Sequence, residues 1–139
     1  MDSKKLSWAE LVFLLKERAI EFMKLAEEAL RDGRYDVACA LFEQAFQLYL
    51  KYMLLRFYSI RVKSHDLREL IGILALKTGN ERLADFAKRN RSELILLEES
   101  YYVGRYGEYE FEEEEGRACE RVTKRAFELL HEIERSLED

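Results

Sequence analysis

The chain of 139 residues contains no proline and only six glycines. Both residue types are needed at the many tight turns that join the short strands of a β-sandwich or a β-barrel. A chain with so few of them is better suited to long helices, whose interiors exclude proline and disfavour glycine. The length is that of one domain. We therefore predict an all-α protein in which residues 1–139 form a single domain.

Apolar residues recur every three or four positions along five segments, as expected for helices that bury one face. The first helix should begin at a capping box formed by Ser7 and Glu10 and end near Arg31, before the Asp32-Gly33 turn. Helices are predicted over about residues 7–31, 34–58, 64–78, 83–101 and 113–137, with Ser64 as the cap of the third and a tyrosine-rich loop over 104–111. Short connections favour an antiparallel up-and-down bundle of four to five helices.

Charge and hydropathy exclude several classes of protein. The formal net charge of −5 argues against non-specific binding of duplex DNA through the overall field of the protein. No apolar run approaches the roughly 20 residues that span a bilayer, and no signal-peptide core is visible. We therefore expect a cytoplasmic protein without membrane attachment. Abundant Glu, Lys and Arg beside few Asn and Gln are typical of thermophile surfaces.

Cys39 and Cys119 stand alone, without a CxxC pair or a companion pair of histidines. Their spacing indicates neither a disulfide framework nor a zinc site, and we interpret both as free thiols in a reducing compartment. The Walker, Rossmann, His-Glu-x-x-His and Gly-x-Ser-x-Gly motifs do not occur in the sequence either. We therefore predict neither a metal nor a cofactor.

Four short motifs, taken in order, carry a resemblance to a known family. They are Asp32-Gly33 at the end of the first helix, Gln44-Ala45 with Lys51, His65-Asp66-Leu67, and Arg105-Tyr106. In this order and spacing the sequence resembles a HEPN domain over about residues 10–137. The resemblance implies an antiparallel helical bundle, frequent homodimers, and frequent partnership with minimal nucleotidyltransferases in toxin–antitoxin pairs.

Catalytic members of this family cleave RNA without a metal, through an Arg followed four to six residues later by a His. Arg125 and His131 match that spacing. A His can transfer the proton at the 2′-hydroxyl or the leaving oxygen, while an Arg stabilises charge on the phosphate. In one uninterrupted helix the two side chains would point about 120° apart, so we expect a site only where a second subunit completes it. The alternative is a histidine near a helix C-terminus without a catalytic role.

Two further groups of residues are candidates for binding a nucleotide or an RNA phosphate. The first surrounds the start of the third predicted helix and consists of Arg61, Lys63, Ser64, His65 and Arg68. Free amides and cations at a helix start suit a phosphate, and the alternative is a structural His65 that fixes the chain there.

The second group is Arg105 with Tyr106, because an aromatic face beside a cation can hold an unstacked base. The alternative is that the tyrosines fill the corner between two helices. A further basic cluster over residues 88–91 is interpreted as a solvated face.

The second predicted helix carries more aromatic residues than one core-facing stripe needs, namely Phe42, Phe46, Tyr49 and Tyr52. This excess predicts an apolar face for a second subunit. We therefore predict a homodimeric HEPN-like module that binds a nucleotide or RNA phosphate, or that partners a minimal nucleotidyltransferase. The alternatives are a metal-independent ribonuclease toxin that uses Arg125 and His131, and a helical scaffold without a small ligand.

Overall fold

The computed structural model describes residues 3–106 and 110–139, with side chains left out for residues 104–106. This part of the chain folds into six helices and contains no strand, so the all-α prediction is confirmed, while the predicted four to five helices are too few. The helices are α1 (Trp8–Arg31), α2 (Tyr35–Tyr58), α3 (Leu67–Thr78), α4 (Glu81–Arg89), α5 (Arg91–Tyr106) and α6 (Glu113–Glu138). None of these helices is both long and apolar enough to cross a membrane.

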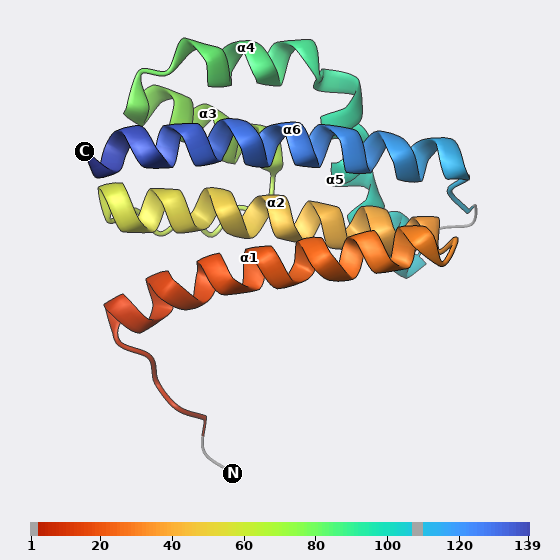
Figure 1. Ribbon diagram of the computed structural model, residues 1–139, viewed down its shortest axis with the longest axis horizontal. Helices are drawn as coiled ribbons and strands as arrows, with labels where there is room; N and C mark the ends of the chain where they lie inside the picture. Colours follow the sequence, from red (N-terminus) through yellow and green to blue (C-terminus); the bar gives the residue numbers. More distant parts are fainter. Residues whose placement is uncertain (1–2, 107–109) are drawn as a thin grey trace.

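The three longest helices, α1, α2 and α6, lie side by side, and α1 and α4 occupy opposite edges of the bundle (Figure 1). The predicted hairpin is present: α1 and α2 are antiparallel, and Gly33 takes the left-handed conformation that the tight turn requires, with φ of 76°. In contrast, α6 runs in the same direction as α2, which departs from a strict up-and-down order.

Helix α2 is the centre of the bundle, because it contacts α1, α3, α5 and α6. All four aromatic residues that we assigned to a second subunit, Phe42, Phe46, Tyr49 and Tyr52, are buried within the chain itself. That assignment was wrong because it assumed a helix with one buried face. A helix surrounded on most sides by neighbours buries residues around nearly its whole circumference.

Local capping explains where several helices begin. Ser7 Oγ accepts a hydrogen bond from the amide of Glu10 at 3.2 Å, and the amide of Ser7 donates one to Glu10 Oε1 at 3.1 Å. The predicted capping box is therefore confirmed. The cap of α3 is Asp66 rather than Ser64: Asp66 Oδ1 accepts from the amide of Arg68 at 3.0 Å, while Ser64 Oγ accepts from the amide of Asp66.

The helix predicted over residues 83–101 is divided into two. Helix α4 ends at Arg89 and α5 begins at Arg91; between them, the side-chain amide of Asn90 donates to the carbonyl of Phe86 at 2.9 Å. Such side-chain hydrogen bonds to the backbone compete with the helix and favour its end. Helix α5 also continues through Gly104 to Tyr106, so these first residues of the predicted loop are helical.

The two cysteines are joined in a disulfide between α2 and α6, and both are fully buried. The prediction of free thiols was therefore wrong. Cys39 and Cys119 are 80 residues apart in the sequence, with their Cα atoms 5.5 Å apart. They meet only because α2 and α6 lie side by side, which their spacing does not reveal.

The first turns of α6 pass very close to the α1–α2 hairpin at Gly116. A Cβ atom at this position would lie 2.9 Å from Leu30 Cδ1 and from Tyr35 Cδ1. Such distances are shorter than van der Waals contact, so only glycine allows α6 to approach the hairpin this closely.

Candidate functional site

Helix α6 is uninterrupted, and it places the two candidate catalytic residues in different surroundings. Arg125 lines a groove between α4 and α6. His131 does not line this groove; its Nδ1 atom lies 3.9 Å from Glu134 Oε1, and 60% of its side chain is exposed. Both residues are therefore accessible, but the structure does not bring them together within one chain.

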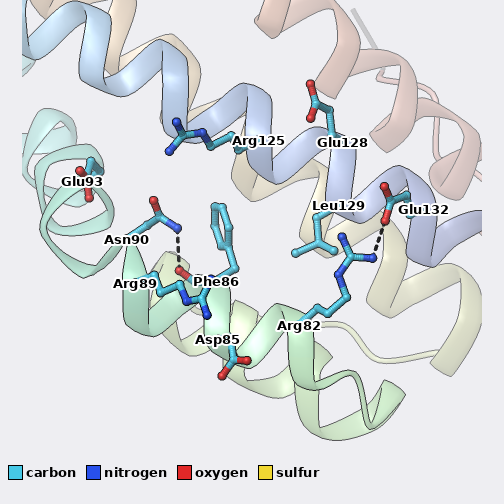
Figure 2. Close-up of a pocket in the computed structure, with 10 residues that line it drawn as sticks. All are labelled: Arg82, Asp85, Phe86, Arg89, Asn90, Glu93, Arg125, Glu128, Leu129 and Glu132. Atoms are coloured by element: carbon cyan, nitrogen blue, oxygen red, sulfur yellow. Dashed lines mark hydrogen bonds and ion pairs between the residues drawn. The ribbon is translucent and has the colours of Figure 1, made fainter.

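The groove between α4 and α6 has a volume of about 690 Å³. Half-buried Phe86 and buried Leu129 provide its apolar surface. The residues that line it are Arg82, Asp85, Phe86, Arg89, Asn90, Glu93, Arg125, Glu128, Leu129 and Glu132 (Figure 2). Small-molecule sites in proteins commonly have volumes of about 300–1,000 Å³, with an apolar lining and a few polar groups.

Two of the three arginines in this groove have no partner in the part of the chain that the structure describes. Arg82 Nη1 is paired with Glu132 Oε2 at 2.7 Å, which closes one end of the groove. Arg89 and Arg125 form no hydrogen bond or ion pair with any described residue. Figure 2 shows them on opposite walls, with Phe86 and Asn90 between them.

None of the four acidic residues that line the groove is paired with Arg89 or Arg125. Asp85 and Glu128 point away from the groove, and Glu93 stands at the end where α5 begins (Figure 2). Four carboxylates and three arginines line the groove, so the groove is of mixed charge and is distinguished by its two guanidinium groups that no carboxylate of the described residues pairs. Sequence reasoning assigned Arg89 to a solvated basic face. The signal that identifies it is its position beside α6, which depends on the tertiary fold.

At the start of α3, carboxylates of the chain already hold the groups that were predicted to bind a phosphate. Arg68 donates to both oxygens of Glu98, from Nε at 3.0 Å and from Nη2 at 2.9 Å. The amide of Arg68 donates to Asp66 and to Glu98, and Ser64 Oγ donates to Glu69 at 2.8 Å. Burial alone would raise the pKa of Asp66, but the side-chain hydrogen bond with Glu98 and the hydrogen bonds from the amides of Glu69 and Arg68 outweigh it and keep that pKa below its ordinary value.

The remaining members of that predicted site are dispersed. His65 Nδ1 lies 2.9 Å from Gln47 Oε1. The side-chain nitrogen of Gln47 in turn donates a hydrogen bond to Glu43 at 2.8 Å. Arg61 lines a different cavity, against Leu11 of α1, and Lys63 is exposed. The structure therefore brings Ser64, His65 and Arg68 to the start of α3 but leaves Arg61 apart from them.

The other predicted binding pair, Arg105 and Tyr106, has its side chains outside the part of the chain that the structure describes. Within the described ranges, 3–106 and 110–139, no three His, Cys, Asp or Glu side chains gather as ligands for a metal ion.

A buried carboxylate on α6, Glu134, organises a polar cluster that sequence reasoning missed. It accepts hydrogen bonds from Tyr49 at 2.6 Å, from Tyr52 at 2.5 Å and from Lys16 at 2.7 Å, and Arg56 lies 3.3 Å away. Burial alone would raise the pKa of Glu134, but the hydrogen bonds outweigh it and lower that pKa below 4.5. Burial and the bond to Glu134 raise the pKa of Tyr52 to about 12.

This cluster ties α1 and α2 to α6 and is a structural feature. Its signal in the sequence is a glutamate one turn after Leu130 and one residue after Ile133, both of which are buried on the apolar face of α6. A charged residue at such a position requires partners from neighbouring helices.

The family model of the HEPN domain matches residues 12–136, which is nearly the whole chain. The chain belongs to the HEPN family. No curated protein and no solved structure shows significant similarity to it. HEPN domains are generally linked to RNA binding or nuclease activity and commonly dimerise. A HEPN function of this chain therefore has to be carried by a bundle with a buried α2 and a groove between α4 and α6.

Proposed function

We propose that this HEPN domain binds the phosphate of a nucleotide or of RNA in the groove between α4 and α6. The observation that supports this proposal is that the guanidinium groups of Arg89 and Arg125 face one cavity from opposite walls and have no partner among the residues that the structure describes. Guanidinium groups bind phosphate oxygens through charge-assisted, often bidentate hydrogen bonds. Phe86 between them supplies an aromatic surface of the kind on which bases stack.

We place the binding site here rather than at the start of α3. There, Asp66 and Glu98 already accept the hydrogen bonds that a phosphate would accept. A phosphate would have to displace Glu98 from Arg68 and would face the carboxylate of Asp66. In the groove between α4 and α6, Arg89 and Arg125 are paired with no carboxylate of the described residues, so a phosphate would displace none from them.

The experiment is a fluorescence-anisotropy titration of labelled single-stranded RNA with the wild type and with Arg89→Gln and Arg125→Gln. Each variant should bind about tenfold more weakly, because a hydrogen bond to a charged group contributes roughly 1.5–3 kcal/mol. Arg135→Gln is the matched control: Arg135 is also an exposed arginine of α6, but it lies outside the groove. An equal loss in the control would show only non-specific attraction and would contradict the proposal.

The second candidate function is metal-independent cleavage of RNA by Arg125 and His131. The observation in its favour is that both side chains are exposed on one helix and that Arg125 has no partner among the described residues. Because the two lie apart within one chain, a site requires His131 of one subunit to meet Arg125 of another.

Cleavage of labelled RNA in EDTA tests this second function, with Arg125→Ala and His131→Ala as variants. If the site forms between subunits, each variant alone is inactive. An equimolar mixture then regains about a quarter of the activity, because half of the dimers are mixed and each has one intact site. Activity retained by both variants would rule out this pair.

Homodimer formation and partnership with a minimal nucleotidyltransferase remain proposals about assembly. The aromatic residues of α2 no longer support a dimer, since they are buried within one chain. Helix α1 instead leaves Phe13 and Ile20 exposed, seven residues apart and thus on one side of the helix. Sedimentation equilibrium of the wild type and of Phe13→Ser with Ile20→Ser tests the dimer. Co-purification with a minimal nucleotidyltransferase encoded beside this chain tests the partnership.

A further inference from the structure

We propose that a groove along the α1–α2 hairpin is a docking site for an extended segment of a partner protein in which apolar and basic residues alternate. We call it the hairpin groove. Its walls include Leu11, Leu15 and Phe22 of α1 and Val37, Gln44 and Lys51 of α2. The inference is independent of the function proposed above, which concerns the groove between α4 and α6.

Two cavities lie in line in the hairpin groove, because their lining residues repeat at helical spacing. Phe22 follows Leu15 by seven residues on α1, and Gln44 precedes Lys51 by seven residues on α2. Seven residues are about two turns, so each pair lies on one side of its helix. Because α1 and α2 are antiparallel, the cavity at Phe22 and Gln44 continues the cavity at Leu15 and Lys51 toward the turn at Gly33.

The segment that joins α2 to α3 occupies the first half of this groove. Helix α2 ends at Tyr58 and α3 begins at Leu67, and residues 59–66 between them are not helical. The segment runs back along α2, because its His65 Nδ1 lies 2.9 Å from Oε1 of Gln47, about three turns before the end of that helix.

Apolar and basic residues alternate along this segment. Ile60 and Val62 are half-buried and line the cavity at Leu15, whereas Arg61 and Lys63 between and after them are exposed. The segment therefore fills the groove with every second side chain and leaves its charges near solvent. The fold thus shows which kind of segment the walls of this groove accept.

Beyond His65 the hairpin groove holds two further cavities. The one at Phe22 has a volume of about 350 Å³, and Val37 on its wall is 48% exposed. The other has a volume of about 410 Å³ and shares Glu43 and Tyr101 with the first. His65 lines this second cavity, so the space begins where the chain's own segment turns away into α3.

Carboxylates make this part of the groove attractive to a cation. Glu43, Asp66 and Glu98 line the cavity of about 410 Å³, and none of its lining residues in the described part of the chain is Lys or Arg. From outside the cavity, Arg68 pairs with Glu98 at 2.9 Å, and the charge of Lys51 interacts with that of Glu43. The three carboxylates therefore outnumber the two cations that reach them.

Two aromatic rings of α5 stand beside these carboxylates. The ring centroids of Tyr101 and Tyr102 are 5.2 Å apart, and 64% of Tyr102 is exposed. Faces of aromatic rings attract the cations of Lys and Arg. A segment that places an apolar residue at Phe22 and a basic residue at Glu43 would therefore suit both cavities. An acidic segment or a nucleic acid would bring like charges together.

Fluorescence anisotropy of labelled peptides with the full chain tests the inference. The probe repeats Ile-Arg-Val-Lys twice, in the order found at residues 60–63. One control peptide replaces the basic residues of the probe with Glu, and the other replaces its apolar residues with Ser. The probe should bind, and each control should bind at least tenfold more weakly, because it lacks either the charge or the apolar contact. No binding of the probe up to about 1 mM, or equal binding of all three peptides, would overturn the inference.

Variants of the groove locate the probe. Val37→Lys puts a cation on the wall of the cavity at Phe22 and should weaken the probe at least tenfold. Leu76→Lys is its matched control, because Leu76 is an exposed apolar residue of α3 that lines neither cavity. Tyr102→Ala should weaken the probe about fivefold, and Trp8→Ala, which removes an exposed aromatic ring at the start of α1, should not. Equal losses in variants and controls would show only non-specific attraction and would contradict the docking site.

Nuclear magnetic resonance separates the remaining outcomes. Addition of the probe should shift the amide signals of residues 37–44 and 98–102 and leave those of α4 unchanged. Shifts confined to residues 59–63 would mean that the probe only displaces the chain's own segment, and would overturn the inference. Shifts of residues 37–44 with protein concentration alone would mean that a second copy fills the groove, which would overturn the assignment to a partner. None of these results bears on the groove between α4 and α6, whose function is tested with RNA.

Discussion

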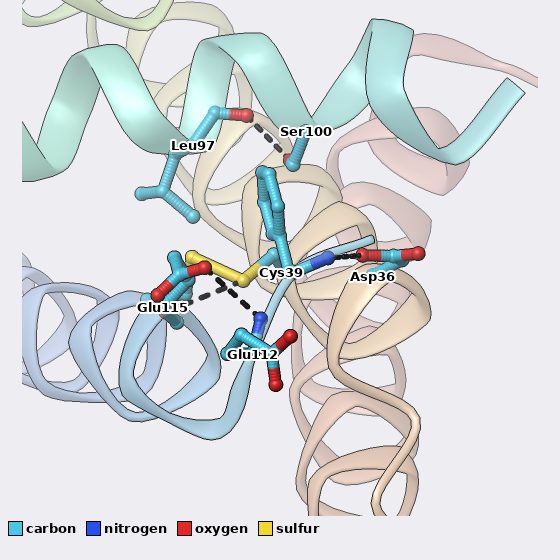
Figure 3. Close-up of a disulfide and its surroundings, with 8 residues drawn as sticks. Asp36, Cys39, Leu97, Ser100, Glu112 and Glu115 are labelled. Carbon is cyan, nitrogen blue, oxygen red and sulfur yellow. Dashed lines mark hydrogen bonds between the residues drawn. A yellow bond between two sulfur atoms is a disulfide. The ribbon is translucent and has the colours of Figure 1, made fainter. Parts of the chain in front are cut away.

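Reduction of the Cys39–Cys119 disulfide is the perturbation from which we expect the largest change in stability. Figure 3 shows the bond between α2 and the first turns of α6. It closes a loop of 80 residues, and in the unfolded chain such a closure removes about 15 cal/mol/K of entropy. At 25 °C this corresponds to about 4.5 kcal/mol, which is the upper value that we expect for its contribution to the free energy of unfolding.

The assay is urea unfolding followed by far-ultraviolet circular dichroism, with and without the reductant TCEP. The reduced protein should have a free energy of unfolding lower by about 3–4.5 kcal/mol. The variant with Cys39→Ala and Cys119→Ala is the control for the reductant, because TCEP should not change its stability. Titration of thiols in urea without reductant should find none in the wild type.

Two results would refute this reasoning at different steps. Two reactive thiols per chain in urea would show that Cys39 and Cys119 are not bonded in the isolated protein. A bond that is present but whose reduction changes the free energy of unfolding by less than about 1 kcal/mol would contradict the entropic argument. In that case the reduced, unfolded chain would already keep α2 and α6 close through residual structure.

The other predictions concern stability and are checked by urea unfolding. Glu134→Leu leaves several buried donors without an acceptor and should cost roughly 3 kcal/mol. Because the pKa of Glu134 is lowered from 4.5, its stabilisation is present above pH 4.5 and is lost as the pH falls further, and the Leu variant should lack that loss. Gly116→Ala should cost about 1–3 kcal/mol through the close contact with the hairpin, whereas Gly72→Ala, with nothing within 4 Å, should gain about 0.5–1 kcal/mol. Asp66→Ala removes the N-cap of α3 and should lower the free energy of unfolding by about 1 kcal/mol, whereas Ser64→Ala should lower it clearly less. A larger loss in the Ser64 variant would contradict the assignment of Asp66 as the cap.

The parts of the fold that could be predicted from the sequence are those determined by neighbouring residues. The capping box of Ser7 and Glu10 and the turn at Gly33 define α1 and the start of α2, because every group involved lies within a few residues of its partner. The start of α6 at Glu113 was located in the same way, from a periodic pattern that resumes after a polar segment.

The errors arose where distant segments or competing local signals decide the structure. Cys39 and Cys119 are brought together by the packing of α2 on α6, and no local pattern reports that contact. The division of the predicted fourth helix depends on one side chain, that of Asn90, in a segment whose apolar periodicity continues without a break.

Of the two arginines that define the candidate groove, the sequence pointed to one as a functional residue and not to the other. Arg125 was selected for its spacing from His131, a residue that does not share its surroundings in the chain. Arg89 was set aside as part of a solvated cluster, because a run of basic residues does not show which of them faces another helix. The pairing of these two arginines is a property of how α4 lies against α6.

The residues of the groove between α4 and α6 lie apart from those that stabilise the core. A variant of the groove can therefore change binding without changing the stability of the fold. Arg89 and Arg125 are exposed and have no hydrogen bond or ion pair with the described residues, so neutralising either one removes no such interaction and should change stability by no more than about 0.5 kcal/mol. Glu134, in contrast, holds α6 against α1 and α2, and its loss should be felt throughout the bundle. His131 lies beside Glu134 but supplies none of the hydrogen bonds from Lys16 and the two tyrosines. A binding or cleavage defect in Arg89, Arg125 or His131 variants with unchanged urea unfolding therefore reports on a ligand or on chemistry, and not on the fold.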